Sequence, residues 1–136
     1  MREIKFRAKI KAVVSNWVYG SLITYKDGSA DICGVDIFRK GDKRSMLTGV
    51  KPDTVGQFTG LHDKNGTEIY EGDIVRVDIS RFDHRIKNRQ YMNDKVEWYQ
   101  YKFVLSKADI NVNMTYRIEV IGNIHDNPEL LEGGVK

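Results

Sequence analysis

The segment between Arg81 and Lys95 contains the side chains whose types and spacing best suit contact with another molecule. Positive charges are interleaved there with aromatic rings, and the side chains that we single out are Arg81, Phe82, Arg85, Lys87, Arg89 and Tyr91. Lysine and arginine hold phosphates while aromatic rings stack on unpaired bases, a combination typical of proteins that bind single-stranded nucleic acids. A charged run is also typical of a solvated surface or of a contact between subunits, and both interpretations stay open.

The N-terminal residues carry a second row of positive charges. Apolar side chains from Ile4 to Ala12 alternate there with charged ones, which predicts a half-buried strand with a charged outer face. The cations of that face would lie about 6.6 Å apart, and we assign Lys5 and Arg7 to the predicted nucleic-acid interface. Lysines on a strand also protect an exposed sheet edge from pairing with other chains, so this alternative stays open as well.

A turn rich in oxygen atoms, from Asp63 to Asp73, is the best candidate for acid–base or metal chemistry. The carboxylates of Glu68, Glu71 and Asp73 could supply the general acid and base of a small hydrolase. A calcium loop of the EF-hand type needs its glycine at position 6, whereas Gly66 would occupy position 4 here. We therefore expect no metal site, and we predict a β-hairpin with an Asx-type turn at this place.

The sequence contains no motif that would bind a nucleotide or activate a nucleophile. It has no phosphate-binding loop, no dinucleotide-binding glycine motif, no nucleophile elbow and no zinc-protease helix motif. One cysteine, Cys33, and three scattered histidines form no zinc-ligand pattern. We therefore expect a protein that is not an enzyme and holds no cofactor, with the small hydrolase as an alternative.

The elements that must position these side chains are mostly strands. Apolar and polar residues alternate with a period of two in several stretches, namely residues 4–12, 17–25, 30–38, 56–61, 75–79, 99–105 and 116–120. Only the stretch Pro128–Leu131 is predicted to be helical, with Asn127 as its N-cap. The predicted fold class is mainly β, with many short strands that favour a small barrel or a sandwich and a minor C-terminal helical turn.

One predicted strand carries aromatic side chains on both faces. Tyr99, Tyr101 and Phe103 share one face, whereas Trp98 and Val96 lie on the other. One of these faces must belong to the core. We predict that Trp98 and Val96 form an interaction surface covered by the N-terminal half, by another subunit or by a ligand.

The charge of the chain is mild in total and uneven in distribution. The 136 residues include 22 Lys and Arg against 19 Asp and Glu, a net charge of +3. Residues 1–50 carry +5, residues 51–80 carry −3, residues 81–107 carry +4 and residues 108–136 carry −3. There is no signal-peptide pattern and no run of roughly 20 apolar residues, so we expect a cytoplasmic protein without a membrane partner.

Several segments of the sequence resemble the YopX family of phage and prophage proteins. They are MREIKFRA at the start, VGQFTGLHDKNGTEIYEGDIV at residues 55–75, V-E-W at residues 96–98 and EVIGNIHDNPELLE at residues 119–132. The resemblance implies an SH3-like barrel, which we place at residues 55–132 with an exposed basic loop at 81–95, after an N-terminal β region at 1–54. It also implies self-association, and it brings no catalytic residues.

The leading hypothesis from the sequence is a phage or prophage accessory protein that acts by binding, without catalysis, and forms a homo-oligomer in the bacterial host cell. Nucleic acid or another phage or host protein would be its partner, and no small-molecule substrate is indicated. The first alternative is a nucleic-acid-binding protein that uses the basic and aromatic loop. The second alternative is the small hydrolase.

Overall fold

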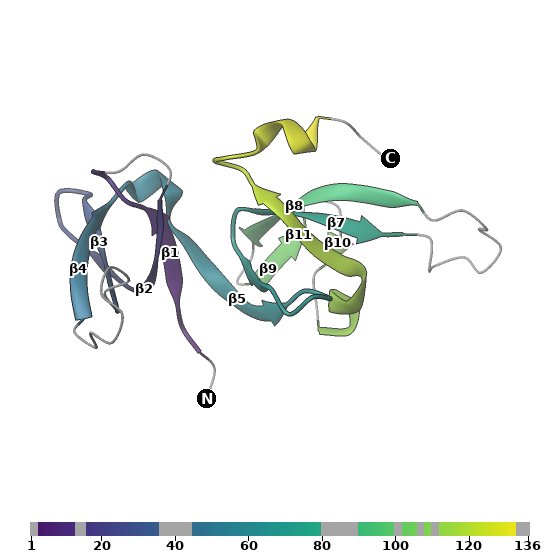
Figure 1. Ribbon diagram of the computed structural model, residues 1–136, viewed down its shortest axis with the longest axis horizontal. Coiled ribbons are helices and arrows are strands. Elements are labelled where there is room, and N and C mark those ends of the chain that lie inside the picture. The colour runs from purple at the N-terminus through teal and green to yellow at the C-terminus, as the bar shows by residue number, and fades with distance from the viewer. Residues whose placement is uncertain are drawn as a thin grey trace. The chain divides into compact units, whose positions relative to one another are not determined.

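The computed structural model describes residues 3–12, 16–35, 45–79, 90–99, 102–105, 108–109 and 112–132. The predicted mainly-β fold class is confirmed, because the described residues form two antiparallel sheets and only short 3₁₀ turns (Figure 1). The chain divides into two compact units, Met1–Phe58 and Thr59–Lys136. The sequence prediction placed the boundary between the two parts after residue 54. In the structure the boundary lies after Phe58, within strand β5 (Gly56–His62).

The first unit is an antiparallel meander. Its strands are β1 (Phe6–Lys9), β2 (Trp17–Thr24), β3 (Ala30–Val35) and β4 (Ser45–Val50), and β1 also pairs with the start of β5. An isolated bridge between Ile10 and Val50 joins the end of β1 to the end of β4. The N–H of Lys51 also donates to the carbonyl oxygen of Lys9 at 2.9 Å. The meander therefore curls until its first and last strands meet at one end.

The core of the first unit confirms most of the predicted alternation along β1. Ala8 and Ile10 are buried there, as predicted, whereas Ile4 is 67% exposed and lies before the strand. The buried side chains that pack together are Ala8, Ile10, Val18, Ala30, Ile32 and Val50. These side chains are small or β-branched, which suits the inside of a tightly curled sheet.

Strands β2 and β3 approach each other so closely that each needs a glycine. A Cβ atom on Gly20 would lie 2.1 Å from the carbonyl oxygen of Cys33, and a Cβ atom on Gly34 would lie 2.4 Å from that of Tyr19. Gly20 also has a φ of 155°, which side-chain-bearing residues rarely adopt. The two glycines, one in each strand, thus allow β2 and β3 to lie close together beside Tyr19.

The second unit continues from β5 and contains a five-stranded antiparallel sheet. The five strands of this sheet are β7 (Asp73–Asp78), β8 (Tyr91–Tyr99), β9 (Lys102–Leu105), β10 (Ala108–Asp109) and β11 (Ile118–Asn123), in the order β10-β9-β8-β7-β11. Strand β6 (Glu68–Tyr70) instead pairs with β5 and belongs to the other sheet. One buried cluster holds this unit together, formed by Ile69, Val75, Val77, Val96, Phe103, Leu105 and Ile118.

The predicted Asx-type turn at Asp63 is confirmed and has a wider role than predicted. Oδ1 of Asp63 accepts the N–H groups of Asn65 at 2.8 Å and Thr67 at 2.9 Å. Oδ2 accepts the N–H of Val120 in β11 at 2.9 Å. Gly66, in the same turn, has a φ of 83°. One buried carboxylate therefore closes the β5–β6 turn and ties it to the last strand.

The prediction of one continuous strand over residues 99–105 is wrong. The chain reverses between β8 and β9, which pair as a hairpin with Tyr99 opposite Lys102 and Trp98 opposite Phe103. Directly paired residues lie on the same face, so Trp98 contacts Phe103 edge to face, with 4.7 Å between ring centroids. Val96 is 1% exposed inside the core, so its predicted place in an interaction surface is wrong.

Three 3₁₀ turns complete the described structure: η1 (Pro52–Thr54), η3 (Val112–Arg117) and η4 (Pro128–Leu131). The predicted C-terminal helical turn is confirmed as η4, and Asn127 occupies its N-cap position as predicted, although the Asn127 side chain makes no capping hydrogen bond. Its Oδ1 instead accepts the N–H of Asn123 at 3.3 Å, which ties the segment to the end of β11. None of the helices in the described ranges is both long and apolar enough to span a membrane.

Candidate nucleic-acid interface

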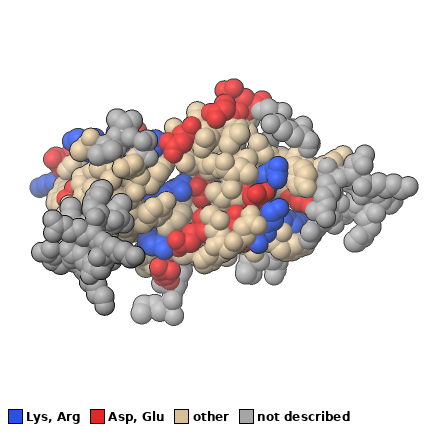
Figure 2. Space-filling view, viewed as in Figure 1, with Lys and Arg blue, Asp and Glu red and all other residues tan. Residues whose placement is uncertain are grey.

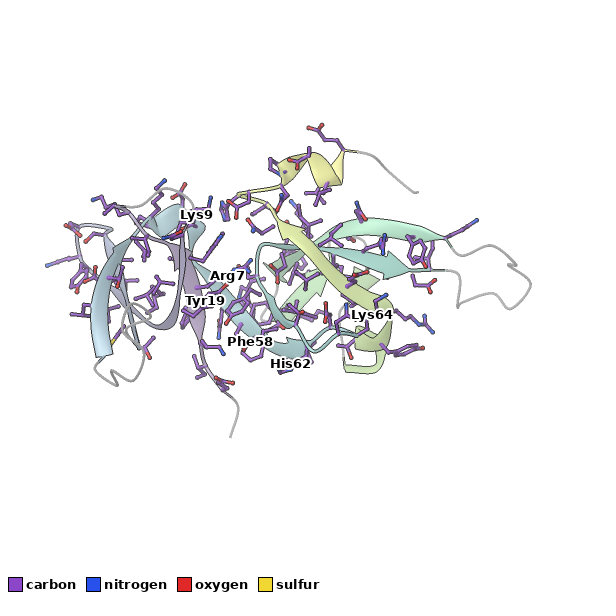
Figure 3. The ribbon with its side chains drawn as sticks, in the orientation of Figure 1. Arg7, Lys9, Tyr19, Phe58, His62 and Lys64 are labelled. Carbon is purple, nitrogen blue, oxygen red and sulfur yellow. The ribbon has the colours of Figure 1, made fainter. Side chains whose placement is uncertain are left out.

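One face of the first unit combines cations with aromatic rings. In the register of β1 and β2, Lys9 lies opposite Trp17 and Arg7 lies opposite Tyr19. Residues directly opposite in an antiparallel pair project from the same face of the sheet. Lys5 lies before β1 and contacts the ring of Phe58 in β5, which is 2% exposed. We call these side chains together the basic–aromatic face: Lys5, Arg7, Lys9, Trp17, Tyr19 and Phe58. Figure 3 labels Arg7, Lys9, Tyr19 and Phe58.

The cations of this face pack against its rings. The guanidinium carbon of Arg7 lies 4.7 Å from the centroid of the Trp17 ring, and Nζ of Lys9 lies 5.7 Å from that centroid. Nζ of Lys5 lies 5.2 Å from the centroid of the Phe58 ring. All three distances fall within the ≈ 6 Å over which the negative face of an aromatic ring attracts a cation. The rings therefore orient the positive charges along the sheet.

Exposure differs strongly among the members of the face. Tyr19 is 48% exposed, and Lys9 and Trp17 are half-buried. Arg7 is only 8% exposed, although the alternation places it on the charged outer face of the strand. Its planar guanidinium packs over the Trp17 ring, and this contact shields the Arg7 charge from water while Trp17 stays half-buried. Lysines and Tyr19, rather than Arg7, are thus the groups that a ligand would reach first.

The turn η1 holds the end of β1 in place beneath this face. The hydroxyl oxygen of Thr54 accepts the N–H of Lys9 at 2.9 Å, and the hydroxyl donates to the carbonyl oxygen of Lys51 at 2.7 Å. Thr54 is 5% exposed, so both hydrogen bonds are shielded from water. Lys9 is consequently fixed by its backbone, and its side chain projects from a defined point.

The predicted basic loop falls on residues that the structure does not describe. Arg81, Phe82, Arg85, Lys87 and Arg89 lie outside the described residues.

The flanks of that segment, in contrast, are described. Asp78 in β7 pairs with Tyr91 in β8, and the N–H of Ile79 donates to the carbonyl oxygen of Gln90 at 3.0 Å. The segment therefore connects two neighbouring strands of the second unit. Tyr91 is half-buried, and the guanidinium carbon of Arg76 lies 4.8 Å from the centroid of its ring. Tyr91 thus belongs to a different unit from Lys5 and Arg7.

The carboxylates considered for a hydrolase lie in β6, directly after it and at the start of β7. Asp73 is 1% exposed, and its Oδ2 accepts the N–H of Tyr70 at 2.7 Å, which tightens the turn between β6 and β7. Glu68 and Glu71 are half-buried. Among the residues that the structure describes, no three His, Cys, Asp or Glu side chains gather as a metal site would require.

Trp17, Tyr19 and Phe58 are members of the face that the sequence did not identify. Their rings lie opposite lysine and arginine only because β2 and β5 pair with β1 in one particular register. That register depends on turns and packing far from the rings, and a shift of one residue would turn every side chain to the other face. The alternation of Trp17, Tyr19 and Ser21 on one side of β2 was the available signal.

The two units differ in charge. Residues 1–58 contain 11 Lys and Arg against 6 Asp and Glu, a net +5, whereas residues 59–136 contain 11 against 13, a net −2. Acidic side chains gather over the C-terminal segment of the second unit, where Asp126, Glu129 and Glu132 are exposed (Figure 2). The basic–aromatic face therefore belongs to the more positive unit.

Comparisons with known proteins agree with the resemblance seen in the sequence. The crystal structure of protein EF1440 from Enterococcus faecalis is similar to this chain, with a TM-score of 0.59 and 25% sequence identity over 96% of this chain and 99% of that one. No curated protein matches the chain. The model of the YopX protein family matches residues 5–132, nearly the whole length. The chain therefore belongs to the YopX family.

Proposed function

We propose that this protein is a non-catalytic binding protein whose ligand is single-stranded nucleic acid, held on the basic–aromatic face. The observation that supports this most is the register of β1 and β2, which places Lys9 and Arg7 directly across from Trp17 and Tyr19. Phosphates need cations and unpaired bases need aromatic surfaces, and this face offers both on a single sheet.

The charge of the first unit supports the same ligand. A net +5 over residues 1–58 attracts a polyanion from a distance, and this attraction weakens as salt is added. The second unit carries a net −2 and would not contribute to that attraction as a whole. A polyanion is therefore steered toward the unit that holds the aromatic rings.

The experiment is a titration of the full chain with fluorescently labelled single-stranded and double-stranded oligonucleotides at several salt concentrations. We expect single strands to bind more tightly, with an affinity that falls as salt rises. Lys9→Ala should weaken binding and flatten the plot of log affinity against log salt by about 0.7, the value for one phosphate on a single strand. Lys26→Ala is the matched control, because Lys26 is exposed in the β2–β3 turn.

Undetectable binding at low salt, or binding without a salt dependence, would refute the proposal. So would a Lys9→Ala protein that binds as the unchanged protein does.

Self-association and a role in a phage or prophage process belong to the same proposal, and their support is the family resemblance. Light scattering at micromolar concentration tests the first, since a monomer of 15.7 kDa would contradict it. Replacing Arg85, Lys87 and Arg89 together with Ala tests the predicted loop separately from the basic–aromatic face. A loss of affinity in that variant would assign the loop to the same ligand.

A further inference from the structure

The half-buried ring of Trp17 and the exposed ring of Tyr19 are spaced for bases that are not stacked on each other. Trp17 and Tyr19 are two residues apart in β2 and project from the same face, so their Cα atoms lie about 6.6 Å apart by the rise of a strand. Consecutive nucleotides of a stacked strand in a duplex advance by only about 3.4 Å. A stacked strand therefore cannot place two consecutive bases on both rings, whereas an extended single strand can.

The lysines of the face lie at both ends of this pair of rings. Lys9 is directly opposite Trp17, and Lys5 lies beyond Arg7, which is opposite Tyr19. Arg7 itself is 8% exposed, whereas both lysines are half-buried. Nζ of Lys5 also lies 3.3 Å from Oε1 of Glu3, so a phosphate at Lys5 would compete with that carboxylate. This arrangement matches a backbone that runs along β1 while its bases turn toward β2.

We propose that the face binds two consecutive unstacked bases, one at Trp17 and one at Tyr19, and that it therefore prefers weakly stacking pyrimidine runs to adenine runs. This inference rests on the proposed function, since it specifies the ligand of the same face. Bases in an oligoadenine strand must first separate from each other, whereas those in an oligothymidine strand are already largely unstacked. Sequence preferences of this origin arise without any hydrogen bonds to base edges.

The test uses the full chain with Trp98→Phe, which leaves Trp17 as the remaining one of two tryptophans. The probes are oligothymidine and oligoadenine of equal length, with oligouridine to compare RNA with DNA. We expect oligothymidine and oligouridine to quench Trp17 emission, and oligothymidine to bind more tightly than oligoadenine. Tyr19→Ala should weaken oligothymidine binding by roughly 5- to 150-fold, the range measured for one stacked base.

Matched variants separate stacking from folding. Tyr19→Phe keeps the ring and should bind nearly as the parent does, while circular dichroism reports whether Tyr19→Ala is still folded. Tyr99→Ala removes a ring that is 58% exposed in the second unit and should leave binding unchanged.

The outcomes distinguish this inference from the function on which it rests. If none of the oligonucleotides binds at low salt, the proposed function and this inference both fail. If oligoadenine binds as tightly as oligothymidine, and a folded Tyr19→Ala protein binds as its parent does, the inference fails while salt-dependent nucleic-acid binding stands.

Discussion

The carboxylate of Asp63 offers a stringent test of how the second unit is held together. It is 7% exposed and accepts three backbone N–H groups, two within its own turn and one from Val120 in β11. Asp63→Asn keeps the shape of the side chain but replaces one acceptor oxygen with an NH₂ group. In either orientation of the amide, at least one backbone N–H then faces another N–H donor.

The expected loss follows from these contacts. A buried donor left without an acceptor costs about 1–3 kcal/mol, and hydrogen bonds to an ionised group are roughly twice as strong as those to a neutral one. One orphaned N–H of Val120 and two weakened bonds within the turn give an expected loss of about 2–4 kcal/mol in the free energy of unfolding. Asp63→Ala removes all three acceptors and should cost more.

Urea unfolding followed by far-ultraviolet circular dichroism measures this loss, because the strands of both units contribute to that signal. The matched control is Asp27→Asn, since the Asp27 side chain also accepts the N–H of a turn residue, Ser29, at 2.9 Å. Asp27 is exposed, and the hydrogen bonds given for it stay within its own turn, so Asp27→Asn should lower the free energy of unfolding much less. Equal losses for the two variants, or no loss for Asp63→Asn, would refute the assignment of Asp63 as the tie between the β5–β6 turn and β11.

Three further changes test the first unit. Gly34→Ala should lower the free energy of unfolding, measured by thermal unfolding, by roughly 1–3 kcal/mol or more, because the new methyl group would lie 2.4 Å from a backbone oxygen of β2. Gly49→Ala is the control, because a methyl group there would lie 3.7 Å from the nearest atom. Thr54→Val should cost about 1–3 kcal/mol in the same measurement, because it leaves the last N–H of β1 without its buried acceptor. The hydrogen bond from the Tyr25 hydroxyl to Asp31 at 2.7 Å raises the pKa of Tyr25 above its ordinary value. The stability that this hydrogen bond gives the folded protein should be fully present at a pH below the ordinary pKa of tyrosine and should be lost as the pH rises through the raised pKa of the folded state. An ultraviolet titration of tyrosinate in which Asp31→Ala fails to lower that pKa would contradict this reasoning.

Local patterns in the sequence predicted what depends on neighbouring residues. The alternation around Ala8 predicted β1, and the spacing of Asp63, Asn65 and Gly66 predicted the Asx-type turn, because each feature is decided by side chains within a few residues. The predicted helical turn at the C-terminus was found for the same reason, since a proline at its first position already has the required φ.

The errors arose where a turn left no mark in the sequence. Gln100 and Tyr101, between β8 and β9, include no Gly, Asn, Asp or Pro, so nothing separated the two strands. Counting the alternation straight through from Trp98 to Phe103 therefore placed these two rings on opposite faces. Pairing across a hairpin places them on the same face, and it moves Val96 into the core.

Because Arg7 is buried, it could position the Trp17 ring rather than contact a phosphate as Lys9 would. A salt titration distinguishes these two roles. If Arg7 contacts a phosphate, Arg7→Gln should flatten the plot of log affinity against log salt by about 0.7, as Lys9→Ala does. If Arg7 instead positions the Trp17 ring, 4.7 Å from its guanidinium carbon, Arg7→Gln should lower the affinity while the slope stays unchanged. We expect the second result, because a side chain that is 8% exposed cannot release a counterion by meeting a phosphate at the surface. A slope that flattens equally in both variants would show that the face opens on binding and that all three cations meet the strand.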